Sequence, residues 1–288
     1  MCHLKLWLFA LLALGAMQVI STAAFAFPDL YKASIAELQA GLDGGHFTSV
    51  DLIKAYFARI EEVNLKGPAL HAILETNPSA IVQAAVLDKE RKITGKRSAL
   101  HGIPILLKRE DGNLLPEFQD NIATIASEGL NTTAGSFSLL GSVVPEDAGV
   151  VKCLRKAGAI ILVSLGTETD GSITCPTSNN NLTGIKPTVG LTSWAGVVPI
   201  SKHQDTVGPM TRSVTDAVIV LSIIAGRDPN DNFTFAQPPI VPDFTKALNK
   251  NALKGKRIGV PRRAFLNDSI SGNDPFINVV FEQALATI

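Results

Sequence analysis

The sequence predicts an α/β fold whose sheet is largely covered by helices. Two observations lead to this class. Short apolar runs of strand length alternate with longer stretches in which apolar residues recur at helical spacing. The apolar runs, such as residues 103–107 and 159–163, lack the polar alternation of a strand with one solvated face. We therefore expect helices on both sides of the sheet.

Residues 1–26 have the pattern of a secretory signal peptide. A weakly basic start precedes an apolar core at residues 6–16, and Ala24 and Ala26 are the small residues of a cleavage site after Ala26. A membrane anchor is the alternative, but the apolar stretch is short for a span. We expect residues 27–288 to be secreted to the extracellular space, with no stable membrane anchor after cleavage.

Three helices are expected next. Ser34 and Glu37 form a capping box that starts a helix over residues 34–42, before two glycines end it. A second helix starts at Thr48 and continues to about residue 60, with apolar residues at helical spacing. A third opens at Pro78, since proline is favoured in a first helical turn, and runs to about residue 92.

Strands and helices then alternate. Residues 103–107 form a predicted strand that leads into Lys108, and a helix over about residues 147–157 precedes the strand at 159–163. Further strands are expected at residues 196–200 and 257–260, further helices at 213–225 and 274–282, and a surface loop at 228–242.

Composition excludes several function classes. The 26 basic and 26 acidic residues give a net charge of zero without a basic stripe, so no nucleic-acid partner is expected. The five histidines and the cysteines show no metal-ligand spacing, and no cofactor-binding pattern is present, so we expect neither a metal nor a cofactor. Cys153 and Cys175 remain after signal cleavage, and the sequence leaves open whether they pair. It also leaves the oligomeric state open.

Four sequons follow the signal peptide and are possible glycosylation sites. Their asparagines are Asn131, Asn181, Asn232 and Asn267.

A polar, glycine-containing turn at residues 166–176 follows the strand at 159–163 and carries Ser172. A strand followed by such a turn can present a hydroxyl and several backbone N–H groups to one point. This is the geometry that a serine nucleophile and its oxyanion hole need. A polar loop after a buried strand is the structural alternative, and spacing alone favours it.

A serine nucleophile also needs a base. His203 is the one histidine near a suitable position, but the hydrolase elbow G-x-S-x-G is absent, because Asp170 and Thr174 stand where that pattern has glycines. Lysine can serve as the base when burial leaves it neutral. Lys108, at the end of an apolar strand, is a lysine of this kind.

Together these residues resemble the amidase signature family, which comprises serine hydrolases that act on amide bonds. The resemblance runs from about residue 29 to the end of the chain. The matching blocks, in order, are residues 101–108, 120–124, 131–136, 166–176, 184–191 and 204–210.

The resemblance implies that Ser172 is the nucleophile and Lys108 the base. It implies an oxyanion hole formed by backbone amides around Thr169, Asp170, Gly171 and Ser172. It also implies a mixed β-sheet flanked by helices, with residues 27–288 as a partial amidase domain. The substrate would be a small-molecule or peptide amide, cleaved through an acyl-enzyme that water then releases.

The chain departs from the family pattern in three places. Family members pass the proton through a bridging serine in a Gly/Ser-rich segment, and no such serine is found here, because Ser164 lies in an apolar strand without glycine neighbours. Residues 109–119 are inserted directly after Lys108. Family domains also continue well beyond Ile288. The alternative is therefore a catalytically inactive, truncated amidase-like protein, which is either a gene-model or splice artefact or a relic that only binds a ligand.

Overall fold

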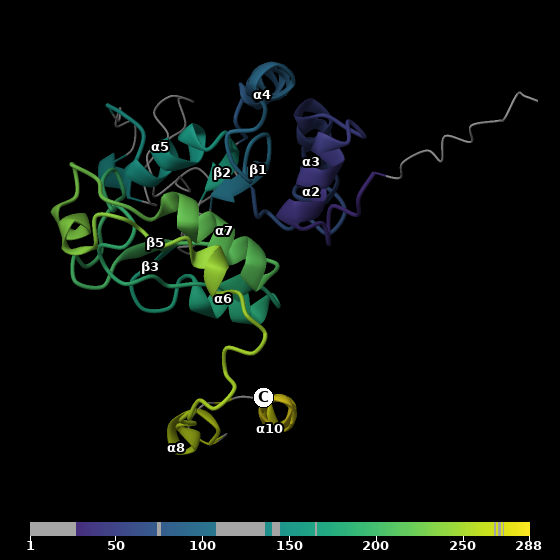
Figure 1. The fold of residues 1–288 in the computed structure, drawn as a ribbon. Helices are drawn as coiled ribbons and strands as arrows, with labels where there is room; N and C mark the ends of the chain where they lie inside the picture. The colour runs from purple at the N-terminus through teal and green to yellow at the C-terminus, as the bar shows by residue number, and fades with distance from the viewer. Residues whose placement is uncertain are drawn as a thin grey trace, which may run out of the picture.

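The computed structural model describes residues 27–73, 76–107, 136–139, 145–164, 166–267, 269, 272 and 274–288 (Figure 1). The predicted signal peptide, Lys108, the insertion at residues 109–119 and Asn131 lie outside the described residues.

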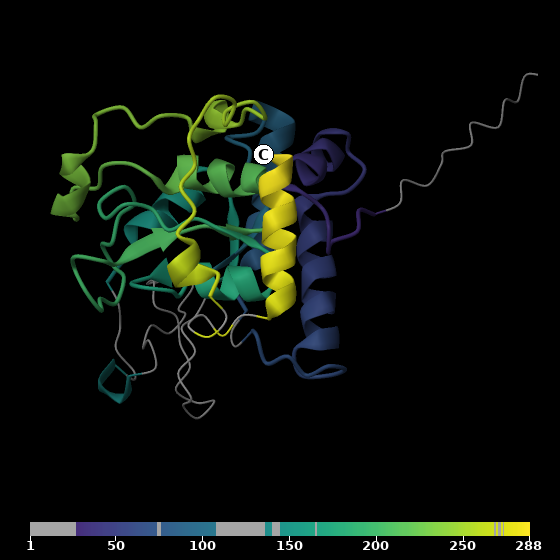
Figure 2. The ribbon, with the colours of Figure 1, turned by 90° about the horizontal axis from the view of Figure 1, so that it is seen from below.

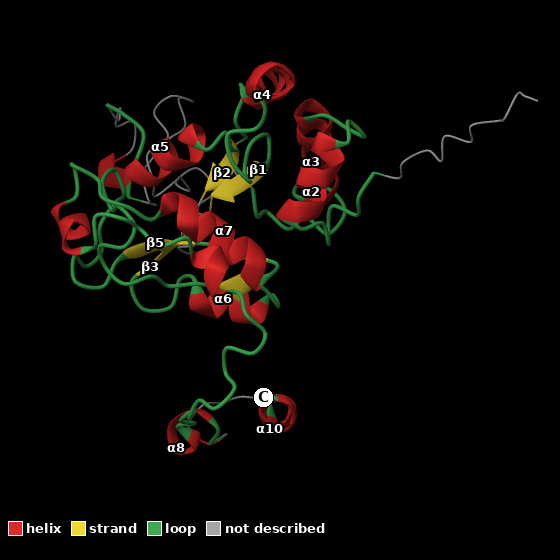
Figure 3. Ribbon diagram, in the orientation of Figure 1, coloured by secondary structure: helices red, strands yellow, loops and turns green. Residues whose placement is uncertain are grey.

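Strands, which Figure 3 draws in yellow, pair in both parallel and antiparallel directions. Strand β1 (Pro104–Leu107) pairs in parallel with β2 (Ile160–Ser164). The two other pairs are antiparallel: β3 (Gly166–Glu168) with β5 (Thr206–Gly208), and β4 (Thr183–Gly184) with β6 (Met210–Thr211). The α/β class with mixed strand pairing and flanking helices is confirmed, although in the described residues the strands form three pairs rather than one continuous sheet.

The N-terminal helices follow their predicted caps. Helix α2 (Ile35–Asp43) begins after Ser34, and Ser34 and Glu37 form the expected capping box. Helix α3 (Ser49–Val63) begins after Thr48, whose hydroxyl accepts from the backbone N–H of Asp51. Helix α4 (Ala80–Thr94) starts two residues later than expected. The Asn77 side-chain oxygen accepts the Ser79 N–H at 2.8 Å, so residues 77–79 form a turn before the helix. The Asn77 amide also donates to the Ile161 carbonyl at 2.8 Å, which ties this turn to β2.

The remaining helical elements are short, apart from α7 and α10. Helix α7 is capped by Ser213, as the sequence predicts. In chain order these elements are η3 (Phe137–Leu139), α5 (Gly149–Lys156), α6 (Thr174–Asn179), α7 (Val214–Ile224), η4 (Asn232–Ala236), η5 (Phe244–Ala247), α8 (Arg262–Phe265) and α10 (Pro275–Thr287).

Two predicted strands are wrong. Residues 196–200 form no strand, because Gly196 lies in a turn and Val197 makes only an isolated β-bridge. The Val197 N–H donates to the Trp194 carbonyl at 3.1 Å, and the Ile200 N–H donates to the Asp205 carboxylate at 2.8 Å. Residues 257–260 have no assigned secondary structure and are largely exposed. In both cases an apolar run alone is insufficient, because a strand also needs a neighbouring edge that accepts its backbone hydrogen bonds.

Strand β2 lies between two apolar clusters. Ile161 packs in a cluster with residues of α5 and α7, including Leu154 and Ile224. Its neighbours Ile160 and Leu162 belong to a second cluster, with residues of α3 and α4. Successive side chains of a strand point to opposite faces, so this division shows that helices cover both faces of β2. Figure 1 shows β1 and β2 between the α3–α4 pair and the α5–α7 pair.

Helix α10 has no buried residue, and Phe276, Ile277 and Val279 are each at least half exposed. Figure 1 shows α8 and α10 apart from the other elements, and in Figure 2, viewed from below, α10 lies in front of them. The described packing of the domain therefore does not depend on these two helices.

Replacing Ile161 with alanine is expected to lower the free energy of unfolding by about 2–5 kcal/mol, because the side chain is completely buried and the change leaves a cavity. Urea denaturation measures the loss. Ile258→Ala is the control, since Ile258 is 50% exposed and its truncation should change stability little. Equal losses in the two variants would contradict the placement of β2 in the core.

Candidate active site

Ser172 lies in the turn that joins β3 to α6, and its side chain is half-buried. The predicted oxyanion-hole residues Thr169, Asp170 and Gly171 precede it in the same turn. The Gly171 carbonyl accepts from the Cys175 N–H at 2.8 Å, which closes the turn onto the first residues of α6. The predicted nucleophile and the residues of the predicted oxyanion hole thus lie in one turn, while the predicted base, Lys108, lies outside the described residues.

Glu168, the last residue of β3, fixes the C-terminal side of this turn. Its carboxylate Oε2 accepts the backbone N–H groups of Ile173 and Thr174, each at 2.7 Å, and Oε1 accepts the Thr174 hydroxyl at 3.1 Å. Glu168 is 4% exposed, so these bonds compensate the cost of burying a charge. The carboxylate also satisfies N–H groups at the start of α6 that have no partner within the helix.

Ile173, directly after Ser172, anchors the turn in the interior. Its side chain is completely buried among three glycines that come from three different strands. A methyl group on Gly166, Gly184 or Gly208 would approach the Ile173 side chain to 3.1, 2.9 and 3.0 Å, respectively. A methyl group at any of these positions would crowd Ile173, so the glycines of β3, β4 and β5 together form a close-fitting socket for it.

Asp205 holds the N-terminal side of the turn. Its Oδ1 accepts the Thr169 hydroxyl at 2.6 Å, and its Oδ2 accepts the N–H groups of Ile200 and Ser201 at 2.8 and 2.7 Å. The side chain is 4% exposed, as expected for a carboxylate that organises loops. Lys186 holds the adjoining loop, because its ammonium group donates to the Gln204 carbonyl at 2.9 Å.

The two cysteines are free thiols. Cys175 is exposed on α6, with its sulfur close to Gly171, and Cys153 is half-buried on α5. The pairing that the sequence left open therefore does not occur in this structure.

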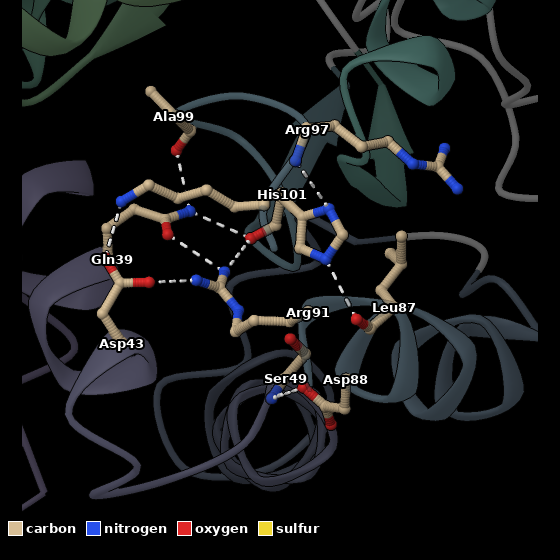
Figure 4. Close-up of polar contacts among 10 residues, drawn as sticks. Gln39, Asp43, Ser49, Leu87, Asp88, Arg91, Arg97, Ala99 and His101 are labelled. Carbon is tan, nitrogen blue, oxygen red and sulfur yellow. Dashed lines mark hydrogen bonds and ion pairs between the residues drawn. The ribbon is translucent and has the colours of Figure 1, made fainter. Parts of the chain in front are cut away.

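The segment that leads into β1 is fixed by a buried histidine (Figure 4). His101 is completely buried; its Nδ1 accepts the Arg97 N–H at 3.3 Å, and its Nε2 lies 2.9 Å from the Leu87 carbonyl oxygen. A carbonyl only accepts, so we assign the ring proton to Nε2. The neutral imidazole then joins α4 to the loop before β1.

The His101 backbone is held as firmly as its ring. Its carbonyl accepts from Gln39 Nε2 at 2.9 Å and from Arg91 Nη2 at 2.7 Å (Figure 4). Arg91 also pairs with Asp43 at the end of α2. A hydrogen bond from Lys96, together with the charges of Lys96 and Arg91, lowers the pKa of Asp43. This network ties the start of β1 to α2 and α4.

The parallel register brings the ends of β1 and β2 together. Leu107, the residue before Lys108, pairs with Ser164, and only residue 165 separates β2 from β3. The strand that leads to the predicted base and the strand that leads to Ser172 therefore end side by side.

The described residues lack the features of a metal site and of a membrane-spanning helix. No three histidine, cysteine, aspartate or glutamate side chains gather there in a way that could hold a metal ion. In the same residues, no helix combines the length and the apolar character needed to cross a bilayer.

The Amidase family model matches residues 51–165 and 161–286 of the chain. The chain belongs to this family. Among curated relatives, the amidase-family chain is 40% identical to "Probable amidase At4g34880" of Arabidopsis thaliana, over 80% of the chain and 53% of the relative. It is 37% identical to a "Putative amidase" of Arthroderma benhamiae, over 94% of the chain and 55% of the relative. The chain thus spans about half the length of these relatives.

Solved structures agree with this family. The native peptide amidase from Stenotrophomonas maltophilia matches with a TM-score of 0.67 and 36% identity, over 80% of this chain and 55% of that one. The peptide amidase PAM in complex with the competitive inhibitor chymostatin matches with a TM-score of 0.71 and 34% identity, over 88% and 59% of the two chains. The amidase-type fold expected from the sequence motifs is therefore confirmed.

Sequence reasoning missed two of the three residues that hold the Ser172 turn, Glu168 and Ile173. Glu168 stands four positions before Ser172, and an acidic residue just ahead of a helical first turn is a signal that could have identified it. Ile173 gave no such signal, because its glycine socket comes from strands that are distant in sequence.

Glu168→Gln is expected to lower the free energy of unfolding by about 1–3 kcal/mol, since hydrogen bonds to a charged acceptor are stronger than those to an amide. Chemical denaturation measures this loss. Glu62→Gln serves as the control, because Glu62 makes an exposed ion pair with Arg59, of a kind that contributes little. A Glu168→Gln protein as stable as the control variant would show that the carboxylate does not hold the turn.

Proposed function

We propose that this chain carries the nucleophile and the base of a carboxylic amide hydrolase. Ser172 Oγ attacks the amide carbonyl while Lys108 accepts the hydroxyl proton. Backbone N–H groups around Thr169, Asp170, Gly171 and Ser172 stabilise the oxyanion. The C–N bond then breaks, the amine leaves with a proton, and water releases the carboxylate from the acyl-enzyme and restores the serine.

The observation that carries this proposal is the way in which the Ser172 turn is held. A nucleophile must be fixed to a fraction of an ångström, and rigid supporting contacts provide this. Glu168, Ile173 and Asp205 fix the turn from three directions while the Ser172 side chain stays partly accessible.

For the substrate we propose small-molecule or peptide amides. The peptide class is supported by the two solved structures that carry the name peptide amidase and share about a third of their aligned residues with this chain.

The second candidate is a catalytically inactive relative that only binds a ligand. The short junction between β2 and β3 favours it, because a single residue leaves no room for the Gly/Ser-rich segment that carries the family's bridging serine. General acid–base assistance contributes about 10²–10⁴-fold to rate, so loss of the bridge would remove much of the activity.

A fluorophosphonate probe, which reacts with activated serines, separates the two candidates. The full chain is expected to be labelled, and Ser172→Ala is expected to abolish the labelling. Ser178→Ala is the matched control, since Ser178 is an exposed serine on α6 outside the turn. A folded chain that stays unlabelled would refute the hydrolase and leave the binding-only relative.

We further propose that the chain is secreted and glycosylated. The support is the pattern of residues 1–26 and the exposure of Asn181, Asn232 and Asn267.

When the full chain is expressed in a eukaryotic secretory host, the protein is expected to appear in the culture medium. Its mass is expected to fall on treatment with an N-glycosidase. Replacing these three asparagines and Asn131 with glutamine should abolish that shift. Protein that remains inside the cell at its unprocessed mass would contradict both proposals.

A further inference from the structure

A cavity of about 660 Å³ lies between α5 and the segment that follows α7. No residue of the Ser172 turn lines it. Arg97 lies ahead of β1, and Lys156 and Ala157 lie just ahead of β2, so these lining residues mark the N-terminal edge of the parallel pair. Ser172 and Lys108 follow the opposite ends of the same strands. The cavity is therefore separate from the candidate active site.

The cavity is lined by four cations and a single carboxylate. The cations are Arg97, Lys152, Lys156 and Arg227, and the carboxylate is Asp228. Two of the cations are already neutralised, since Arg97 pairs with Glu90 and Lys152 with Glu146. Within the described residues Lys156 has no ion pair, and Arg227 donates only to the uncharged Gln237 carbonyl, at 2.8 Å from Nη2.

Asp228 is occupied by neutral donors. Its Oδ2 accepts the Ser193 hydroxyl at 2.5 Å, and its Oδ1 accepts the Asn230 N–H at 2.9 Å. The carboxylate is thus held by Ser193, which is distant in sequence, and by the Asn230 N–H of its own loop. Among the described residues it forms no ion pair with Lys156 or Arg227. Lys156 and Arg227 line the same cavity, and no carboxylate of the described residues forms an ion pair with either of them.

The rest of the lining is mainly apolar or neutral. Ala157, Ile223 and Ala225 contribute apolar surface. Burial, and next the charge of Asp228, raise the pKa of the Cys153 thiol, so its sulfur adds no negative charge near neutral pH. An apolar wall beside two unpaired cations suits a ligand with one anionic group and one apolar portion.

We propose that this cavity binds a small organic anion, whose phosphate or carboxylate group contacts Lys156 and Arg227 and whose apolar portion packs against Ala157 and Ile223. The guanidinium group offers a fork of donors to such an oxygen-rich group, and the ammonium group adds a point charge. The site is independent of the reaction at Ser172.

Calorimetric titration of the full chain at low salt tests this site. Phenyl phosphate and benzoate, which distinguish the two anionic groups, are the probes, and benzyl alcohol is their neutral counterpart. Saturable binding is expected for at least one anion and not for the alcohol. The double variant Lys156→Gln/Arg227→Gln should raise the Kd at least tenfold. Lys250→Gln/Arg263→Gln removes two exposed cations elsewhere and should leave the Kd unchanged.

Two further variants exclude simpler explanations. Lys156 lies in the last turn of α5, where a cation also stabilises the helix dipole, so its loss can lower stability without any ligand. Lys156→Arg keeps the charge and should retain binding within a few-fold. Ser172→Ala should bind the anion as the unmodified chain does. Absence of saturable binding, an unchanged Kd in the cavity double variant, or loss of binding in Ser172→Ala would each overturn the proposal.

Discussion

The Ser172 turn depends on the socket in which Ile173 is buried. Three strands contribute one glycine each, and any side chain at these positions would enter the space that Ile173 fills. Because consecutive residues share a backbone, a fixed Ile173 limits where Ser172 can lie. The free energy that places the candidate nucleophile thus comes in part from apolar packing one residue away from it.

Two buried carboxylates also hold the Ser172 turn, through hydrogen bonds. Glu168 and Asp205 are each 4% exposed, and together they accept four backbone N–H groups and two hydroxyls around the turn. An unpaired buried charge would be costly, so any movement that breaks these bonds is opposed by several kcal/mol. The carboxylate contacts therefore hold the two ends of the turn, while the Ile173 socket anchors the turn in the apolar interior.

Local signals in the sequence identified the longer helices and the strands β1 and β2, because caps and apolar runs act within a few residues. The capping box of Ser34 and Glu37 is an example. The same reasoning failed at residues 257–260, since an apolar run becomes a strand only when a partner edge is available. It also missed Ile173 as an anchor, because Gly184 and Gly208 meet it only after folding. The turn itself was found through its motif, whereas its support depends on contacts that are distant in sequence.

The two edges of the β1–β2 pair differ in the charged groups that lie beside them. At the C-terminal edge, the strands lead to Lys108 and to the Ser172 turn, whose carboxylates are engaged by the chain itself. At the N-terminal edge, the His101 network and the end of α5 are held by hydrogen bonds, and no described carboxylate pairs with Lys156 or Arg227 beside them. Side chains of β2 are packed on both faces, so the strand acts as a stiff element between these edges. An anion at the N-terminal edge would neutralise charge without displacing any contact that holds the Ser172 turn, which is why binding there can be separated from chemistry at Ser172.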